Sequence, residues 1–316
     1  CLLSRGLGDV YKRQHLEDVC RIRTFQAILF DFCPVTIHSG DGAVIGEKLL
    51  NAGMLEYIQK RHKEETPFLF RVEVKGIKDI AEKNRLAKDL SEYLEKYGKG
   101  KLVNEPSFYE AEIRVISGSH GSRVFLKLTC LADERFSYRK YTTSSSMNPA
   151  KAALMIHYVR PYLKPDANVL DPFCGTGTLL IERAMAVSSR SMYGLDISGQ
   201  ALQAAWENSH RANILLQLIQ RNFNDFRHEY LFDEILTDMP RRGGNKTARE
   251  IEYLYHLLFT KGDELLSPDG IMAVYSEEPG MMEKELKGSS KIQLLKKYPM
   301  GRDQASWLYI MRKAEK

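Results

Sequence analysis

Residues 169–184, VLDPFCGTGTLLIERA, decide the fold. A short apolar run ends at Asp171, glycines follow at positions 175 and 177, and a stretch with helical spacing begins at Thr178. Glycine lets the backbone approach a ligand where a Cβ would clash, and open α/β sheets bind ligands at the carboxyl ends of their strands. The stretch therefore predicts a strand, a ligand-binding loop and a helix of a parallel sheet.

Apolar runs alternate with helical patterns from this loop to the end of the chain. Strands that alternate with helices favour parallel pairing, so we expect an α/β domain with a doubly wound, mostly parallel sheet over residues 149–316. The expected helices are Ala150–Arg160, Thr178–Val187, Gly199–Ala212, Ala248–Leu266 and Met281–Leu286. The expected strands are Val169–Leu170, Met192–Asp196, Leu215–Gln220, Glu234–Thr237, Ile271–Ser276, Ile292–Lys297 and Trp307–Met311, with a turn at residues 267–270.

The N-terminal half has a different pattern. Phe68–Val74, Ala111–Ile116 and Val124–Leu131 alternate like strands, and Lys83–Tyr97 places leucines on one helical face. We therefore expect a smaller α+β domain over residues 61–135. Its basic residues are interleaved with acids and predict a solvated face; they include Arg71, Lys75, Lys78, Lys83 and Lys88.

The remaining segments carry weaker signals. Glu47–Arg61 has the spacing of one helix, within a partial domain at residues 15–60. Residues 136–148 contain a Ser/Thr run and predict a linker. The chain opens with Cys1, and residues 1–14 have neither a period nor a cap. We expect residues 1–14 to be a non-native, adapter-derived segment.

Composition excludes several classes of protein. The chain has 316 residues, of which 43% are hydrophobic, and no apolar run approaches the ~18 residues of a membrane helix. Five scattered cysteines form no C-x-x-C pair, so we expect no metal site and a cytoplasmic location. The net charge of +5 permits a nucleic-acid partner without requiring one. Oligomeric state is not readable from the sequence.

The loop after Asp171 favours S-adenosylmethionine (SAM) over a diphosphate cofactor. It is not G-x-G-x-x-G, which argues against a dehydrogenase, and no P-loop lysine follows it. Asp196 ends the next apolar run, where a carboxylate can accept both ribose hydroxyls. Cys174 has no base beside it in the sequence and is expected to be a small buried side chain.

The segments DPFCGTGT and LLIERA closely resemble motif I of class I SAM-dependent methyltransferases. With RFSYRK at residues 135–140 and SSSMNPAKAAL at residues 144–154, the layout resembles the RNA methylases that carry an N-terminal THUMP domain, which include tRNA and rRNA guanine-N2 methyltransferases. The resemblance covers roughly residues 61–316. It implies a Rossmann-like methyltransferase domain at residues 149–316, a THUMP-like RNA-binding domain at residues 61–135, and a ferredoxin-like remnant before it.

The same resemblance implies which residues hold SAM. The residues at the methionine end are Asp171, Pro172, Cys174, Gly175, Gly177 and Thr178. Asp196 would bind the ribose and Ile197 would pack on the adenine. Asn222 stands where the family usually has aspartate near the adenine amino group, and its amide can still accept a hydrogen bond there.

The expected catalytic motif departs from the family pattern [Asn/Asp]-Pro-Pro-[Tyr/Phe]. In EILTDMPRRGG, Asp238 keeps the polar position, next to SAM, and Pro240 keeps the second proline. Met239 replaces the first proline and Arg241 replaces the aromatic residue that stacks on the flipped base. Either the Arg241 guanidinium stacks on the base, or a ring from elsewhere does, or catalysis is weak or absent.

Three functions remain open at this point. The first is a SAM-dependent RNA methyltransferase acting on an exocyclic base nitrogen, guanine N2 before others, in tRNA or rRNA. The second is an N6-adenine methyltransferase acting on nucleic acid. The third is an RNA-binding homologue that keeps SAM affinity without catalysis. Cytosine C5 chemistry is disfavoured, because it needs a nucleophilic cysteine that the segment after the fourth strand lacks.

Overall fold

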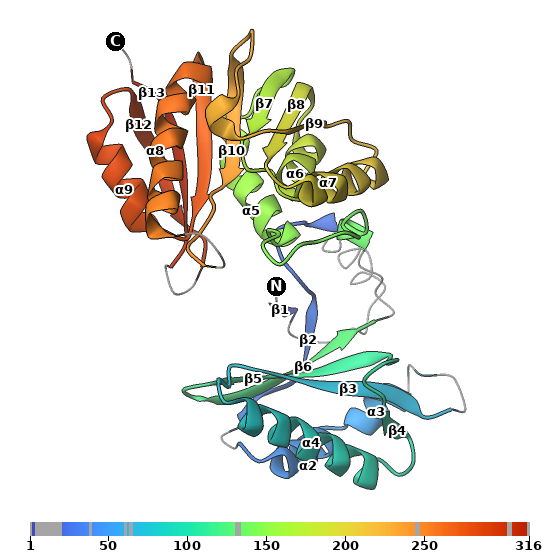
Figure 1. Cartoon of the computed structure of the whole chain (residues 1–316). Coiled ribbons are helices and arrows are strands. Elements are labelled where there is room, and N and C mark those ends of the chain that lie inside the picture. The colour runs from blue at the N-terminus through green and yellow to red at the C-terminus, as the bar shows by residue number, and fades with distance from the viewer. Residues whose placement is uncertain are drawn as a thin grey trace. The chain divides into compact units, whose positions relative to one another are not determined.

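The computed structural model describes residues 2–3, 21–37, 40–59, 62, 66–129, 134–243, 247–301 and 305–314. The chain divides into two compact units. The first contains residues 1–22 and 27–134, and the second contains residues 23–26 and 135–316 (Figure 1). None of the helices in the described ranges has the length and apolar character needed to cross a membrane.

The first unit is a six-stranded sheet in the order β1-β2-β6-β5-β3-β4. Its strands are β1 (Leu2–Leu3), β2 (Leu29–Ile37), β3 (Phe68–Lys75), β4 (Leu102–Asn104), β5 (Ala111–Gly118) and β6 (Gly121–Leu128). Its described helices are α2 (Gly42–Asn51), α3 (Met54–Gln59) and α4 (Ile80–Tyr97), which cover the same face (Figure 1). Alternate residues of β3, such as Phe70 and Val74, are buried with Leu90 of α4, which explains the period-2 pattern.

Two expectations for this region differ from the structure. The single helix expected at Glu47–Arg61 is two helices, because Gly53 adopts a left-handed φ of 84° between them. The expected division at residue 60 does not separate two units, since β2 pairs with β6 in one sheet. Of the expected non-native segment, residues 1 and 4–14 lie outside the described residues, whereas Leu2 and Leu3 form β1 beside β2.

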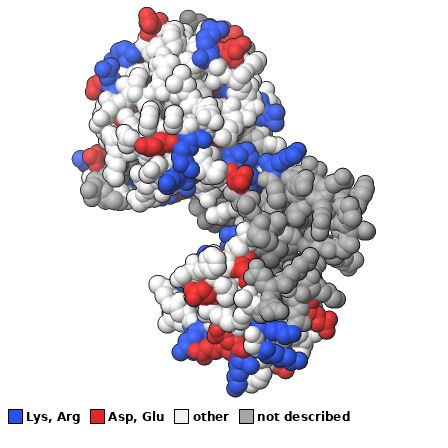
Figure 2. All heavy atoms as spheres, turned by 90° about the vertical axis from the view of Figure 1, so that its right-hand side faces the viewer, with Lys and Arg blue, Asp and Glu red and all other residues white. Residues whose placement is uncertain are grey.

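The basic residues of the first unit are largely paired. Arg71 donates to the buried Glu112, and Glu73 pairs with Lys75. In Figure 2, Lys and Arg side chains are intermixed with Asp and Glu on the face shown. This interleaving agrees with the solvated face expected from the sequence.

The second unit is a seven-stranded sheet in the order β12-β13-β11-β10-β7-β8-β9. Its strands are β7 (Ala167–Asp171), β8 (Ser189–Asp196), β9 (Gln217–Gln220), β10 (Phe232–Asp238), β11 (Leu266–Ser276), β12 (Ile292–Pro299) and β13 (Trp307–Lys313). β7 to β11 are parallel, and β13 runs antiparallel between β11 and β12. The expected doubly wound, mostly parallel sheet is thereby confirmed.

Helices cover both faces of this sheet. They are α5 (Pro149–Val159), α6 (Thr178–Ala186), α7 (Gly199–Arg211), α8 (Ala248–Leu265) and α9 (Pro279–Gly288). α5, α6 and α7 pack on one face, and α8 and α9 pack on the other (Figure 1). The turn expected at residues 267–270 lies within β11, where the pairing with β10 shifts register.

The segment expected to be a linker is built into the second unit. Tyr138 is buried, and its hydroxyl donates to the Glu182 carboxylate at 2.6 Å. Arg23 donates to both oxygens of the same carboxylate at 2.8 Å. The Tyr141 backbone N–H donates to the buried Asn208 of α7. These contacts fix residues 138–141 on the sheet-covering helices, which is not the behaviour of a free spacer.

Candidate functional site

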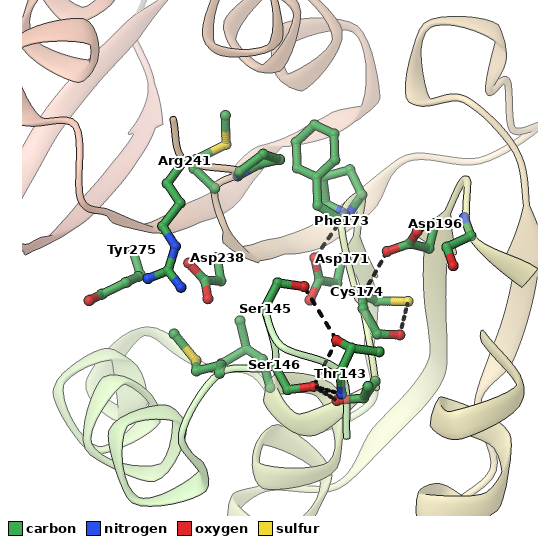
Figure 3. A pocket seen from close by; sticks show the side chains of 18 of the residues that line it. Thr143, Ser145, Ser146, Asp171, Phe173, Cys174, Asp196, Asp238, Arg241 and Tyr275 are labelled. Atoms are coloured by element: carbon green, nitrogen blue, oxygen red, sulfur yellow. Dashed lines mark hydrogen bonds between the residues drawn. The ribbon is translucent and has the colours of Figure 1, made fainter. Parts of the chain in front are cut away.

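A cavity of about 890 Å³ opens in the second unit, at the carboxyl ends of its parallel strands. Its wall includes the residues that end β7, β8 and β10, namely Asp171, Asp196 and Asp238. Residues 143–148, which precede α5, form another part of the wall. In Figure 3, Asp238 and Tyr275 lie at one end of the cavity and Asp196 lies at the other. The position agrees with the ligand site expected for an open α/β sheet.

The loop after β7 is held by hydrogen bonds from both sides. One oxygen of Asp171 accepts from the Phe173 backbone N–H at 3.0 Å and from the Thr237 hydroxyl at 2.7 Å. The Cys174 backbone N–H donates to the carbonyl of Leu195 at 2.8 Å, which ties the loop to β8. Burial raises the pKa of Asp171 to about 7, although these hydrogen bonds oppose the rise.

The two glycines of the loop have separate roles. Both have left-handed backbones, with φ of 51° at Gly175 and 75° at Gly177. Gly175 lines the cavity, and a Cβ added there would meet no atom within 4 Å. Gly177 is not among the lining residues; a Cβ there would lie 3.2 Å from the Cβ of Ala205 in α7. Gly177 therefore permits close packing of α7, which differs from its expected place at the SAM methionine end.

The Asp196 end of the cavity contains the residues expected near a nucleoside. The exposed Ile197 and Asn222 both line it. The side-chain oxygen of Asn222 accepts from the backbone N–H of Asn224 at 3.0 Å, so this amide also holds its own turn. Asp196 accepts from Gly175 and from Ser198 through different oxygens.

Three further expected residues line the cavity: Pro172, Cys174 and Thr178. The thiol of Cys174 is buried against Gly194, where an added Cβ would lie only 2.8 Å from the sulfur. Burial raises the pKa of this thiol well above its usual value. Cys174 is a packing residue, as the sequence predicts, and not an activated nucleophile.

The opposite end of the cavity is built around Asp238. The backbone N–H of Met239 donates to the Tyr275 carbonyl at 3.0 Å, which fixes the turn after β10. Met239, which replaces a family proline, is buried in the core with residues of α8 and also lines the cavity. Pro240 lines the cavity next to Asp238. The carboxylate of Asp238 has no hydrogen-bond or ion-pair partner within the described ranges.

The electrostatic environment of Asp238 favours its protonated form. Burial, together with the negative charge of Glu277, raises the pKa of this carboxyl to about 7. The cations of Lys151 and Arg241 oppose the rise. Asp238 therefore titrates near neutral pH, where a small change in its surroundings alters its charge.

Arg241 forms an ion pair with Glu277, a residue that was not among those predicted from the sequence. Its guanidinium donates to the Glu277 carboxylate at 2.8 Å. The Tyr275 hydroxyl donates to the other oxygen of Glu277 at 2.9 Å, and the Lys151 amine donates to that hydroxyl at 2.6 Å. Lys151, Tyr275 and Glu277 all line the cavity. The sequence does contain one signal: Glu277 directly follows an expected strand, as Asp171 and Asp238 do.

Three basic residues follow Arg241 in the sequence, and the structure describes two of them, Arg242 and Arg249. Arg242 donates to both oxygens of the Glu278 carboxylate. Lys246 lies outside the described residues. Arg249 stands in the first turn of α8, at an exposed position.

The sequence of this unit matches a known family over residues 137–304. The chain belongs to the RMKL-like methyltransferase domain family. Methyltransferases of this family use SAM as the methyl donor. The match covers the loop after β7, Asp196 and the motif at Asp238, all of which line the cavity.

Two curated relatives are similar to this chain. A tRNA (guanine(10)-N2)-dimethyltransferase of Methanothermobacter thermautotrophicus is 25% identical over 201 residues, covering 63% of this chain and 55% of the relative. The protein of the same name from Methanocaldococcus jannaschii is 28% identical over 167 residues, covering 50% and 45%. This chain thus spans about half the length of the curated relatives it matches.

Solved structures share the fold. TrmN from Thermus thermophilus is 19% identical, with a TM-score of 0.57 over 83% of this chain and 78% of that one. SMU.472, solved as a complex with SAH, is 15% identical, with a TM-score of 0.60 over 95% of this chain and 88% of that one. Both cover more than the second unit, so the fold similarity extends into the N-terminal half.

The cavity fits the cofactor of this family. At Gly175 the backbone leaves open space that a side chain would fill, which suits close approach of a ligand. Asp196 offers an oriented carboxylate for hydroxyl donors. A sulfonium cation is also compatible with a wall that carries Asp171 and Asp238.

Proposed function

We propose that this chain is a SAM-dependent RNA methyltransferase that methylates an exocyclic nitrogen, guanine N2, of tRNA or rRNA. The observation that carries the proposal is the carboxylate of Asp238, which has no partner among the described residues, in the cavity that Gly175 and Asp196 also line. The names of the two curated relatives support guanine N2 in tRNA as the target.

The residues of the cavity suit the two ends of SAM. Asp196 would bind the ribose, Ile197 would pack on the adenine, and Asn222 would lie near the adenine amino group. Gly175 and Asp171 would border the methionine end, with Pro172, Cys174 and Thr178 shaping the wall. When bound, SAM supplies the methyl group.

Asp238 would act on the target base. Its carboxylate can accept a hydrogen bond from the exocyclic amine and thereby orient the nitrogen lone pair toward the methyl donor. Because its pKa is raised to about 7, the carboxylate can also receive the proton that the amine loses after the methyl group is transferred. Pro240 would border the base. Phe173, which also lines the cavity, would supply the aromatic ring for stacking on the base that Arg241 lacks.

The N-terminal unit would bind the RNA. Its strand and helix order supports a THUMP-like module, and RNA readers of this kind recognise shape and ends. The intermixed charges of this unit favour contacts with the RNA backbone at selected points over a continuous basic surface.

The test is transfer of labelled methyl from SAM to protein-free tRNA, rRNA and DNA pools from cells that lack this gene. Label in an RNA pool, recovered as N2-methylguanosine after nucleoside analysis, is the expected result. Recovery as N6-methyladenosine would overturn the ring-atom assignment, and label in DNA would overturn the substrate class.

One alternative has an observation in its favour. Arg241 replaces the stacking aromatic and is engaged with Glu277, which suits an RNA-binding homologue that keeps SAM affinity without turnover. Asp238→Ala separates the two functions. If the chain is an enzyme, the variant should lose ~100-fold or more in kcat while its SAM affinity changes little. If the wild-type protein and the variant bind RNA equally and neither methylates it, the RNA-binding alternative is favoured.

A further inference from the structure

Asp238 ends β10, and Glu277 directly follows β11, the neighbouring strand. Asp238 and Tyr275 are register partners in the parallel pair β10 and β11. Side chains of register partners point to the same face of a sheet, and the Tyr275 hydroxyl donates a hydrogen bond to Glu277, just beyond the strand. All three residues line the cavity. A base that meets Asp238 therefore also faces the end of β11.

The carboxylate of Glu277 is held in place by hydrogen bonds but can still accept more of them. One oxygen accepts from the Tyr275 hydroxyl at 2.9 Å, and the other accepts from Arg241 at 2.8 Å. Lys151 lies 3.9 Å from the first oxygen. A carboxylate has about four lone-pair sites, so each oxygen keeps one for a further donor. The side chain is 32% exposed, within the cavity wall.

The network keeps Glu277 ionised. Partial burial raises the pKa of Glu277, but the ion pair with Arg241 and the hydrogen bond from Tyr275 outweigh it, so the pKa lies below its usual value. At neutral pH the residue is therefore an acceptor only. Together with Asp238, it presents two adjacent acceptors to a target base.

Two adjacent acceptors distinguish the purines. Guanine presents N1–H and the N2 amine side by side, so both groups donate. Adenine presents its N6 amine beside N1, which carries a lone pair and would face a carboxylate. A base that covers the Glu277 carboxylate without donating to it leaves an acceptor desolvated and unsatisfied, and this cost makes the site select guanine over adenine.

We propose that Glu277 is a specificity-determining residue that accepts the N1–H of the target guanine while Asp238 accepts from its exocyclic amine. This inference rests on the proposed function. It assigns to the Arg241 position a role in orienting an acid, in place of the aromatic ring that stacks on the base in the family pattern.

The experiment uses the full chain and a synthetic RNA corresponding to the substrate found in the labelled pools. Its target guanosine is replaced by 2-aminopurine, which keeps the N2 amine but has a lone pair at N1. The ratio of kcat/KM for the two RNAs is measured with the wild-type protein, Glu277→Gln and Glu277→Asp. Glu283→Gln is the matched control, because Glu283 pairs with Lys297 and does not line the cavity.

The wild-type protein and the Glu283→Gln control should both prefer guanine by about tenfold or more. Glu277→Gln should bring the ratio to within about threefold of unity, because a glutamine amide can donate to an unprotonated N1. Glu277→Asp keeps the charge and should restore part of the preference. SAM affinity, measured by calorimetry, should be unchanged in all variants, which would show that the fold is intact.

An unchanged guanine preference in Glu277→Gln, with methylation of guanine still measurable, would overturn this inference and leave the proposed function standing. The absence of any methylated RNA for the wild-type protein would instead overturn the proposed function, and with it the basis for assigning Glu277.

Discussion

The backbone N–H of Gly175 donates a hydrogen bond of 3.0 Å to Oδ2 of Asp196. This bond joins the loop after β7 to the end of β8, the neighbouring strand. The second oxygen, Oδ1, accepts from the Ser198 backbone N–H at 2.8 Å, at the start of α7. Backbone groups thus orient the carboxylate in advance, and its remaining lone pairs can accept two hydroxyl groups of a ribose.

Asp196→Ala should weaken SAM binding by about 10- to 100-fold, since hydrogen bonds to a charged group contribute about 1.5–3 kcal/mol. Isothermal calorimetry with SAM measures the change. Asp269→Ala is the matched control, because Asp269 is an exposed acid near the opposite ends of the strands. Equal SAM affinity of Asp196→Ala and the wild-type protein would refute the assignment of Asp196 to the ribose.

Alanine at the two loop glycines should produce two different defects. Both substitutions strain a left-handed backbone, at a cost of about 1 kcal/mol. Only Gly177→Ala also crowds Ala205, so it should lower the melting temperature further. Only Gly175→Ala adds a methyl group to the cavity, so it should lower SAM affinity more. Thermal melts and calorimetry on both variants check this, and a larger affinity loss at Gly177 would contradict the assignment.

Replacing Glu234 by Gln should strongly destabilise the second unit. Its carboxylate binds Arg183 through both oxygens, at 2.6 and 2.8 Å, and both side chains are fully buried. Removing one charge of a buried pair leaves the other uncompensated, at a cost of about 3–5 kcal/mol. Urea unfolding measures this. Glu252→Gln, which breaks an exposed ion pair with Lys284, should have a much smaller effect. Similar losses in both variants would contradict the argument.

The loop after Asp171 could be predicted from the sequence because its signals are local. A strand end, two glycines and a helix start are contiguous, and Asp196 and Asp238 each end an apolar run. The fold of the second unit followed from the same alternation. The break at Gly53 escaped prediction because one glycine only weakens a helical pattern, whereas its left-handed φ ends the helix.

The network at Glu277 could not be read in the same way. Lys151, Tyr275 and Glu277 come from α5 and from the strand beside Asp238, and only the register of β10 and β11 brings them together. The role of residues 138–146 was hidden for a related reason. Their Ser/Thr content resembles a linker, but contacts with Glu182 and Asn208, distant in sequence, make them part of the second unit.

Asp238→Asn should remove the acidic limb of the pH profile. In the wild-type protein, kcat/KM should rise as pH increases through about 7, because the ionised carboxylate of Asp238 accepts the amine proton and burial has raised its pKa to that value. Asparagine keeps an oxygen acceptor but does not titrate. The variant should therefore be slower at pH 8 and nearly independent of pH between 6 and 8.

The same substitution should stabilise the fold as pH rises. The folded-state pKa of Asp238, about 7, is raised above its ordinary value of 3.8, so its contribution to stability is present below that ordinary value and is lost as pH rises through about 7. Asparagine carries no buried charge at any of these pH values. The melting temperature of Asp238→Asn should therefore exceed that of the wild-type protein by a margin that grows from pH 5 to pH 8. If the acidic limb persists in Asp238→Asn and this margin stays constant, the titrating group is not Asp238, and Asp171, whose pKa is also raised to about 7, takes its place.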